Sequence, residues 1–134
     1  MSSKISKELS NHRLEQAKED LISAKLNYEH NLYKSANNRA YYSIFHAIRA
    51  VVALDGFDSS KHSGLIAHFN QNYVKTGIFS KELSKIIRAA SENREKADYL
   101  DFFIASKDEA EKQIKRAELF SDSIREFLKG KSII

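Results

Sequence analysis

Arg39, Tyr42, Ser43 and His46 form the first group of side chains that could do chemistry. Their spacings of three, four and seven residues place them on one line along a helix, and we call these four residues the polar line. Arginine can bind an anion through its fixed fork of donors, and histidine can transfer protons near neutral pH. The neighbouring residues are apolar, and buried polar groups need hydrogen-bond partners. The polar line is therefore either a structural network or a site.

The stretch Arg94–Tyr99 is the second such group. It offers two cations, two carboxylates and a phenol within six positions. On a regular helix Arg94 and Asp98 lie one turn apart, where they would form an exposed ion pair of small energetic value. The residues alone leave two interpretations open, an exposed ion pair or a functional site.

Other kinds of site find little support in the sequence. The Glu-x-x-His spacing of carboxylate-bridged metal bundles is absent, and His62 and His68 are six residues apart, so we predict surface or capping histidines. The absence of cysteine excludes disulfides, thiolate metal sites and a cysteine nucleophile. The four glycines are scattered, which argues against phosphate loops, and no strained nucleophile elbow is visible. We expect neither a metal nor a cofactor.

The composition predicts an all-α protein. The 134 residues include no proline, no tryptophan and only four glycines, which favours helices over sheets. We expect a single domain over residues 1–134, with residues 1–5 and 129–134 as frayed termini. The polar start and the lack of a long apolar stretch predict a cytoplasmic protein without membrane contact. The net charge of +4 permits a polyanionic partner but is weak evidence alone.

Apolar residues at three- and four-residue steps predict about five helices, and an antiparallel bundle is the expected fold. Asn31 is expected to cap the second helix, Gly56 to end it, and Ser106 to open the fifth helix through a capping box. The first helix is expected over residues 6–28, the second over 31–54 and the fifth over 106–128. A short third helix ends near residue 74. The fourth begins at residue 80 and loses its apolar stripe at residues 91–96, ahead of an ordered connection over 98–104.

The second helix is expected to lie in the interior of the bundle, because it is apolar on nearly all faces. Alanines on its other faces would let neighbouring helices approach closely. We also expect Leu9 to face the core from the first helix, and Ile78 and Phe79 to plug the loop after the third. The apolar stripe of the second helix consists of Tyr41, Ile44, Phe45, Ile48, Val51 and Val52.

Four ordered segments give the chain a resemblance to a known family. The chain resembles the HEPN superfamily of small helical bundles, in particular its short single-domain members that are paired with minimal nucleotidyltransferases. The similarity covers most of the chain. The matching segments are the opening helix with Ala17, Asp20 and Leu21, then Arg39–Ala47 (RAYYSIFHA), then Lys61–Gly64 (KHSG) with Phe69 and Val74–Gly77 (VKTG), and finally Arg94–Tyr99.

The resemblance implies a homodimer in which the arginine motifs of two subunits meet across a two-fold axis. Many members are metal-independent endoribonucleases, often toxins encoded beside a minimal nucleotidyltransferase that neutralises them. Active members carry an arginine, then four to six residues, then a histidine. Arg94 matches the arginine, whereas the three candidate histidine positions hold Tyr99, Leu100 and Asp101.

Two hypotheses follow from this resemblance. In the enzyme hypothesis, Arg94 stabilises the phosphorane, Asp98 and Tyr99 position the RNA, and Lys96 contacts a phosphate. His46 with Arg39 is a possible substitute for the missing motif histidine, because six residues separate these two, and Arg39, Tyr42 and His46 are also candidate binding residues.

In the binding-module hypothesis, the dimer binds RNA or a nucleotide without turnover and acts through its nucleotidyltransferase partner. Tyr99 would then be a hydroxyl that the partner can modify with a nucleotide. The neighbouring open reading frame and a cleavage assay would separate the two hypotheses.

Overall fold

The computed structural model describes residues 4–99 and 105–134, apart from the side chains of residues 97–99. Every regular element within those residues is helical, which confirms the predicted all-α class. In chain order the elements are α1 (Lys4–Glu29), α2 (Tyr33–Val52), the 3₁₀ turn η1 (Ala53–Asp55), α3 (His62–Phe69), the π-helical turn η2 (Asn70–Val74), α4 (Lys81–Tyr99) and α5 (Lys107–Gly130).

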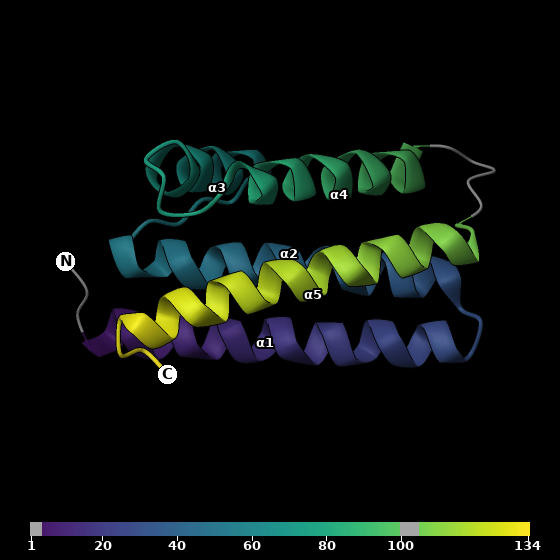
Figure 1. Cartoon of the computed structure of the whole chain (residues 1–134), viewed down its shortest axis with the longest axis horizontal. Coiled ribbons are helices and arrows are strands. Elements are labelled where there is room, and N and C mark those ends of the chain that lie inside the picture. Colours follow the sequence, from purple (N-terminus) through teal and green to yellow (C-terminus); the bar gives the residue numbers. More distant parts are fainter. Residues whose placement is uncertain (1–3, 100–104) are drawn as a thin grey trace.

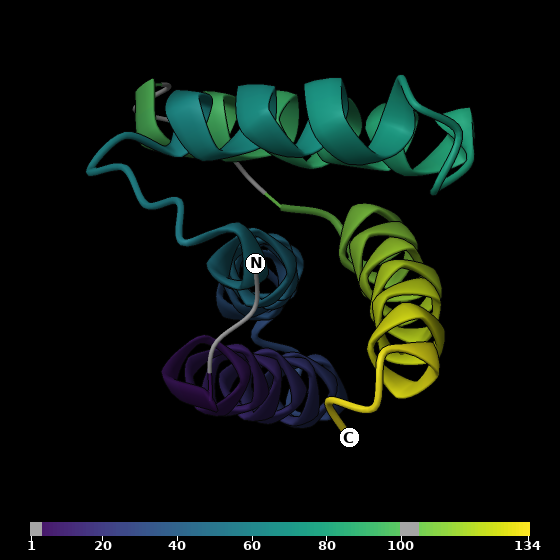
Figure 2. The same ribbon diagram turned by 90° about the vertical axis from the view of Figure 1, so that its left-hand side faces the viewer.

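Helix α2 runs through the middle of the bundle, as its apolar pattern predicts (Figure 1). Figure 2 shows α3 and α4 as one layer on one side of α2, with α1 on the opposite side and α5 alongside. The layer of α3 and α4 brings two distant parts of the chain, around residues 62 and 94, against α2. Among the described residues, no helix combines the length and the apolar character needed to cross a membrane.

Small side chains let α1 and α2 approach closely. Ala47 and Ala50 of α2 are fully buried. Ser10 donates a hydrogen bond to the carbonyl oxygen of Ala50 at 2.6 Å, and Ser43 donates to that of Ala17 at 2.8 Å. Ser43 therefore belongs to the α1–α2 interface. Ser43 thus has the structural role that the sequence left open for the polar line.

Aromatic side chains join the α3 segment to α5. Phe69 and Phe120 are fully buried, with ring centroids 5.8 Å apart, and Phe79 lies 5.4 Å from Phe69. Phe79 thus plugs the loop as predicted. The same prediction is wrong for Ile78, which is 51% exposed, and Leu9 is 38% exposed rather than inward-facing. These two apolar residues lie at the edges of the core, where periodicity alone does not separate inside from outside.

The helix end that the sequence predicts at Gly56 is confirmed. Gly56 closes η1 in the left-handed conformation, with φ of 68°. The predicted cap at Asn31 is wrong: Asn31 adopts φ of 64° in the turn after α1, and Leu32 is the N-cap of α2 without a side-chain bond. Asparagine tolerates the left-handed conformation better than most residues, which suits it to that turn.

Helix α4 is longer than its apolar stripe. It continues to Tyr99, so Asp98 and Tyr99 belong to the helix rather than to the predicted connection, and residues 100–104 lie outside the described part. Asn93 explains how the polar part of α4 stays on the bundle. Its side chain accepts a hydrogen bond from Asn37 at 2.9 Å and donates to Glu109 at 3.5 Å.

Ser106 caps α5 as predicted, because its Oγ accepts a hydrogen bond from the Glu109 amide at 3.1 Å. We expect Ser106→Ala to lower the free energy of unfolding by about 1 kcal/mol, the usual cost of a lost N-cap. Ser106→Asp keeps an acceptor and should cost much less. Urea unfolding of both variants measures the difference, and equal losses would show that the cap contributes no stability.

Candidate functional site

Arg94 reaches from α4 onto the surface of α2. Its Nη1 donates a hydrogen bond to Asn38 Oδ1 at 2.9 Å, and its Nη2 lies 3.4 Å from the Tyr42 hydroxyl oxygen. The guanidinium carbon is 5.4 Å from the Tyr42 ring centroid and 6.0 Å from that of Tyr41, which are cation–π distances. The side chain is half-buried. The cation is therefore held in place by α2 while keeping access to solvent.

His62, the first residue of α3, lies against the same pair of tyrosines. Its Nδ1 shares a hydrogen bond of 2.9 Å with the Tyr41 hydroxyl, and its ring stacks on Phe45 with centroids 3.8 Å apart. Its centroid is 6.5 Å from that of Tyr42. Burial lowers the pKa of His62, and the positive charges of Arg49 and Arg94 lower it further. The residue is nevertheless exposed, so its ring can meet a ligand in its neutral form.

His62 is a site residue that the sequence analysis missed. His62 is exposed, which confirms the predicted surface position, and its ring also joins an aromatic network with Tyr41 and Phe45. Sequence spacing gives no signal of this contact, since 21 positions separate Tyr41 from His62. The only signal was its place in the segment that resembles the family.

Arg94 contacts the polar line at Tyr42, which is one of its members. The guanidinium carbon of Arg39 lies 5.0 Å from the centroid of the Tyr42 ring, and Arg94 contacts the same ring. Asp20 of α1 contacts both Arg39 and His46: its carboxylate lies 3.0 Å from Arg39 Nη1 and 3.5 Å from His46 Nε2. The two groups of residues that the sequence left separate therefore form one continuous polar surface.

The Asp20 network also has a structural role. Burial raises the pKa of Asp20, although the charges of His46 and Arg39 oppose that change. Burial lowers the pKa of His46, although the nearby Asp20 carboxylate opposes that change. The positive charges of Arg49, Arg39 and Arg13 lower it further. His46 Nδ1 is buried and has no hydrogen-bond partner among the described residues. His46 is thus less available to a ligand than His62.

These shifts predict a pH dependence of stability. The folded pKa of His46 is below its unfolded value of about 6.5, so the associated stability is complete above that pH and is lost as the pH falls through the folded value. When the pH falls from 7.5 to 5.5, we expect the free energy of unfolding to decrease less in His46→Gln than in the wild type. Urea titrations at both pH values test this, with exposed His12→Gln as the control. Equal losses in His46→Gln and wild type would contradict the prediction.

The remaining predicted residues lie farther along α4. Lys96 is exposed on the helix. Asp98 and Tyr99 belong to the helix by their backbone, but their side chains lie outside the described residues, as do Leu100 and Asp101 altogether. The geometry therefore brings together Arg94 and the polar line, and leaves the predicted contributions of Asp98 and Tyr99 as proposals.

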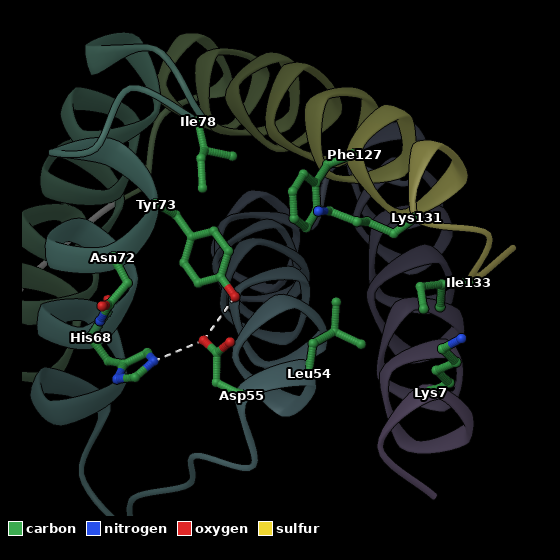
Figure 3. Close-up of a pocket in the computed structure, with 10 residues that line it drawn as sticks. All are labelled: Lys7, Leu54, Asp55, His68, Asn72, Tyr73, Ile78, Phe127, Lys131 and Ile133. Carbon is green, nitrogen blue, oxygen red and sulfur yellow. Dashed lines mark hydrogen bonds and ion pairs between the residues drawn. The ribbon is translucent and has the colours of Figure 1, made fainter. Parts of the chain in front are cut away.

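A cavity of about 700 Å³ lies at the end of the bundle away from Arg94 (Figure 3). Asp55 accepts hydrogen bonds there from the Tyr73 hydroxyl at 2.7 Å and is 3.0 Å from His68 Nε2. Burial and the Asp55 hydrogen bond raise the pKa of Tyr73, so its hydroxyl stays protonated. These polar groups satisfy one another. We place the candidate site at Arg94, where cationic and proton-transfer groups face solvent, rather than in this cavity.

No group of three potential metal-binding side chains occurs in the described part of the chain.

Comparison with known proteins gives a consistent family assignment. Residues 10–127 match the family described as HEPN domain. A "UPF0332 protein" of Thermotoga maritima is 37% identical over 112 residues, which cover 84% of this chain and 85% of that protein. A Methanocaldococcus jannaschii protein that bears the name "Putative toxin" is 37% identical over 116 residues, covering 87% of this chain and 86% of that protein. A second protein of that name from the same organism is 29% identical over 121 residues, covering 90% and 82%.

Proposed function

Because this chain belongs to the HEPN domain family, we propose that it acts on RNA as a metal-independent endoribonuclease and is the toxin-side half of a two-gene module. The observation that carries the proposal is the meeting of Arg94 and His62 on the Tyr41–Tyr42 pair. An arginine fork and a neutral histidine are the two kinds of group that RNA cleavage without metal requires. The names of the archaeal relatives support the toxin assignment.

The proposed reaction is attack of a ribose 2′-oxygen on the adjacent phosphorus. His62 takes the 2′-hydroxyl proton, the new O–P bond forms, and the bond from phosphorus to the 5′-oxygen breaks. Arg94 binds the non-bridging oxygens, whose negative charge grows in the transition state. The leaving 5′-oxygen takes a proton from a water molecule, and His62 later returns its proton to the solvent. The products carry a 2′,3′-cyclic phosphate and a 5′-hydroxyl.

The other predicted residues take positioning roles in this proposal. Asp98 and Tyr99 orient the RNA strand, and Lys96 contacts a neighbouring phosphate. Arg39 and Tyr42 extend the binding surface, because they continue it from Arg94 toward α1. His46 supports this surface through Asp20.

The proposed assembly is a homodimer that places two Arg94 side chains at a shared cleft. The proposed partner is a minimal nucleotidyltransferase that acts as antitoxin. Light scattering of the purified protein tests the dimer, and co-purification with the product of the adjacent gene tests the partner. A monomer at micromolar concentration would contradict the assembly.

The activity is tested by incubating the protein with a structured RNA in EDTA. We expect strand cleavage that leaves 2′,3′-cyclic phosphate ends. Absence of cleavage with retained RNA binding would reject the nuclease proposal, and absence of both would reject RNA as the ligand.

A second candidate is a catalytically inactive RNA- or nucleotide-binding dimer that acts through the nucleotidyltransferase. It is favoured by one feature, the lack of a histidine at Tyr99, Leu100 and Asp101. Co-expression with the adjacent gene should then give a mass increase that maps to Tyr99. An unmodified Tyr99, together with RNA cleavage by the purified protein, would reject this candidate.

A further inference from the structure

A separate cavity of about 490 Å³ opens where the loop between η1 and α3 passes the C-terminal half of α2. Figure 2 shows this loop on the open side of the bundle, away from α5. Arg49 and Asp58 provide the charged groups of the lining, and the Ser59 and Ser60 positions form part of its wall. His62 lines the same cavity, so this space adjoins the site at Arg94.

Arg13 lies behind Arg49, and both guanidinium groups lie within 4 Å of the Asp58 carboxylate. Arg13 of α1 donates to the carbonyl oxygen of Arg49 at 3.4 Å, and its side chain is only 10% exposed. Burial lowers the pKa of Arg13, and repulsion from Arg49 lowers it further. A buried cation next to another cation is costly unless an anion compensates for both.

Asp58 compensates for these charges only weakly. Its carboxylate is 3.8 Å from Arg13 Nη2 and 3.7 Å from Arg49 Nη2, beyond the distance of about 2.7–2.9 Å of strong charge-assisted bonds. It is also 59% exposed, and exposed ion pairs contribute little. Arg49 Nε is buried without a hydrogen-bond partner among the described residues. One weakly placed carboxylate thus faces two arginines, one of which has an unused donor.

We propose that this cavity binds a phosphate group, through Arg49 with Arg13 behind it. A phosphate offers several acceptor oxygens and suits the fixed fork of arginine. The open first turn of α3, whose N-cap Lys61 makes no side-chain bond, adds a favourable helix dipole on the same wall. His62 lies between the cavity and Arg94. The phosphate in the cavity is therefore next to the phosphate that is cleaved at Arg94, on the same RNA strand. This last step rests on the proposed function.

The distance along α2 fits two subsites. Tyr42, which contacts Arg94, and Arg49 are seven residues apart, which corresponds to roughly 10 Å along the helix axis. Both residues thus serve ligands on the same side of α2, two turns apart. A strand lying along α2 would meet Arg94 first and the Arg49 cavity next.

The test uses Arg49→Gln and Asp58→Asn, with exposed Arg88→Gln of α4 as the matched control. The first probe is inorganic phosphate, monitored by the ring resonances of His62. We expect phosphate to shift these resonances in the wild type, less in Arg49→Gln and more in Asp58→Asn, which removes the competing carboxylate. Unchanged resonances in the wild type, or weaker binding in Asp58→Asn, would overturn the proposal.

The second probe is a single-stranded RNA, whose affinity is measured as a function of salt. Loss of one phosphate contact in Arg49→Gln should lower the slope of log K against log salt by about 0.7. A loss of phosphate binding in Arg49→Gln without a change of slope would assign the cavity to a free phosphate or nucleotide instead. Arg88→Gln should change neither readout, and circular dichroism verifies that each variant is folded.

Failure of this proposal is distinguishable from failure of the proposed function. One outcome rejects the cavity alone: RNA cleavage depends on Arg94, Arg49→Gln binds RNA as well as the wild type does, and phosphate does not shift the His62 resonances. Phosphate binding that depends on Arg49 in a protein that neither binds nor cleaves RNA rejects the RNA function and keeps the phosphate site.

Discussion

Arg94→Ala is expected to lower the rate of RNA cleavage by about 10²–10³-fold, the usual cost of removing one preorganised donor to a developing oxyanion. Arg94 is held over Tyr41 and Tyr42 and bonded to Asn38, so its guanidinium needs little rearrangement to meet a phosphate. Single-turnover rates in EDTA measure the loss. Arg88→Ala, an exposed arginine on the same helix, is the matched control and should cleave like the wild type.

Arg94→Lys separates geometry from charge. Lysine keeps the positive charge but lacks the planar fork, so we expect most of the activity to be lost with a smaller loss of RNA binding. Because Arg94 also contacts α2, thermal unfolding of each variant must be compared with its activity. Equal cleavage by wild type and a folded Arg94→Ala would remove Arg94 from the mechanism.

His62→Gln is the second variant with a large expected effect. A positioned proton-transfer group contributes about 10²–10⁴-fold to the rate, and glutamine keeps a polar side chain without the ability to exchange protons near pH 7. Burial and the charges of Arg49 and Arg94 lower the pKa of His62, so its neutral form is available as a base at neutral pH. The pH–rate profile of the wild type should therefore fall on the acid side as His62 becomes protonated, and His62→Gln should lack this limb.

His46→Gln is the comparison that identifies the proton-transfer group. His46 is engaged by Asp20 and is 20% exposed, so we expect only a modest effect on cleavage from its loss. A severe loss in His46→Gln with normal activity in His62→Gln would assign the proton transfer to the Arg39–His46 pair instead.

The fold was largely predictable because the relevant information is local. The repeated apolar residues of α2 predict a buried helix, and the serine three positions before Glu109 predicts the N-terminus of α5. The errors concern residues at boundaries. Asn31 can cap a helix or take a left-handed turn, and Ile78 can point into the core or out of it. In each case packing against distant parts of the chain decides the outcome.

The site was predictable only in part, because its contacts are not local. The helical spacing correctly placed Arg39, Tyr42 and His46 on one surface. The contact of Arg94 with Asn38 spans 56 positions, and no periodic signal records it. His62 is exposed as predicted, but the sequence pattern gives no indication of its contacts with Tyr41 and Phe45. Only the placement of the α3 and α4 layer on α2 brings these residues together (Figure 2).

The most direct measurement is the pKa of His62 by NMR, with and without an RNA that carries a 2′-deoxy nucleotide at the cleavage site and is therefore not cleaved. In the free protein we expect a pKa below the ordinary value, as burial and the two arginines require. In the complex the nearby phosphates should raise it, because a negative charge favours the protonated ring. A His62 pKa that stays the same when the RNA is bound would contradict the account, since no phosphate would then lie between Arg94 and His62.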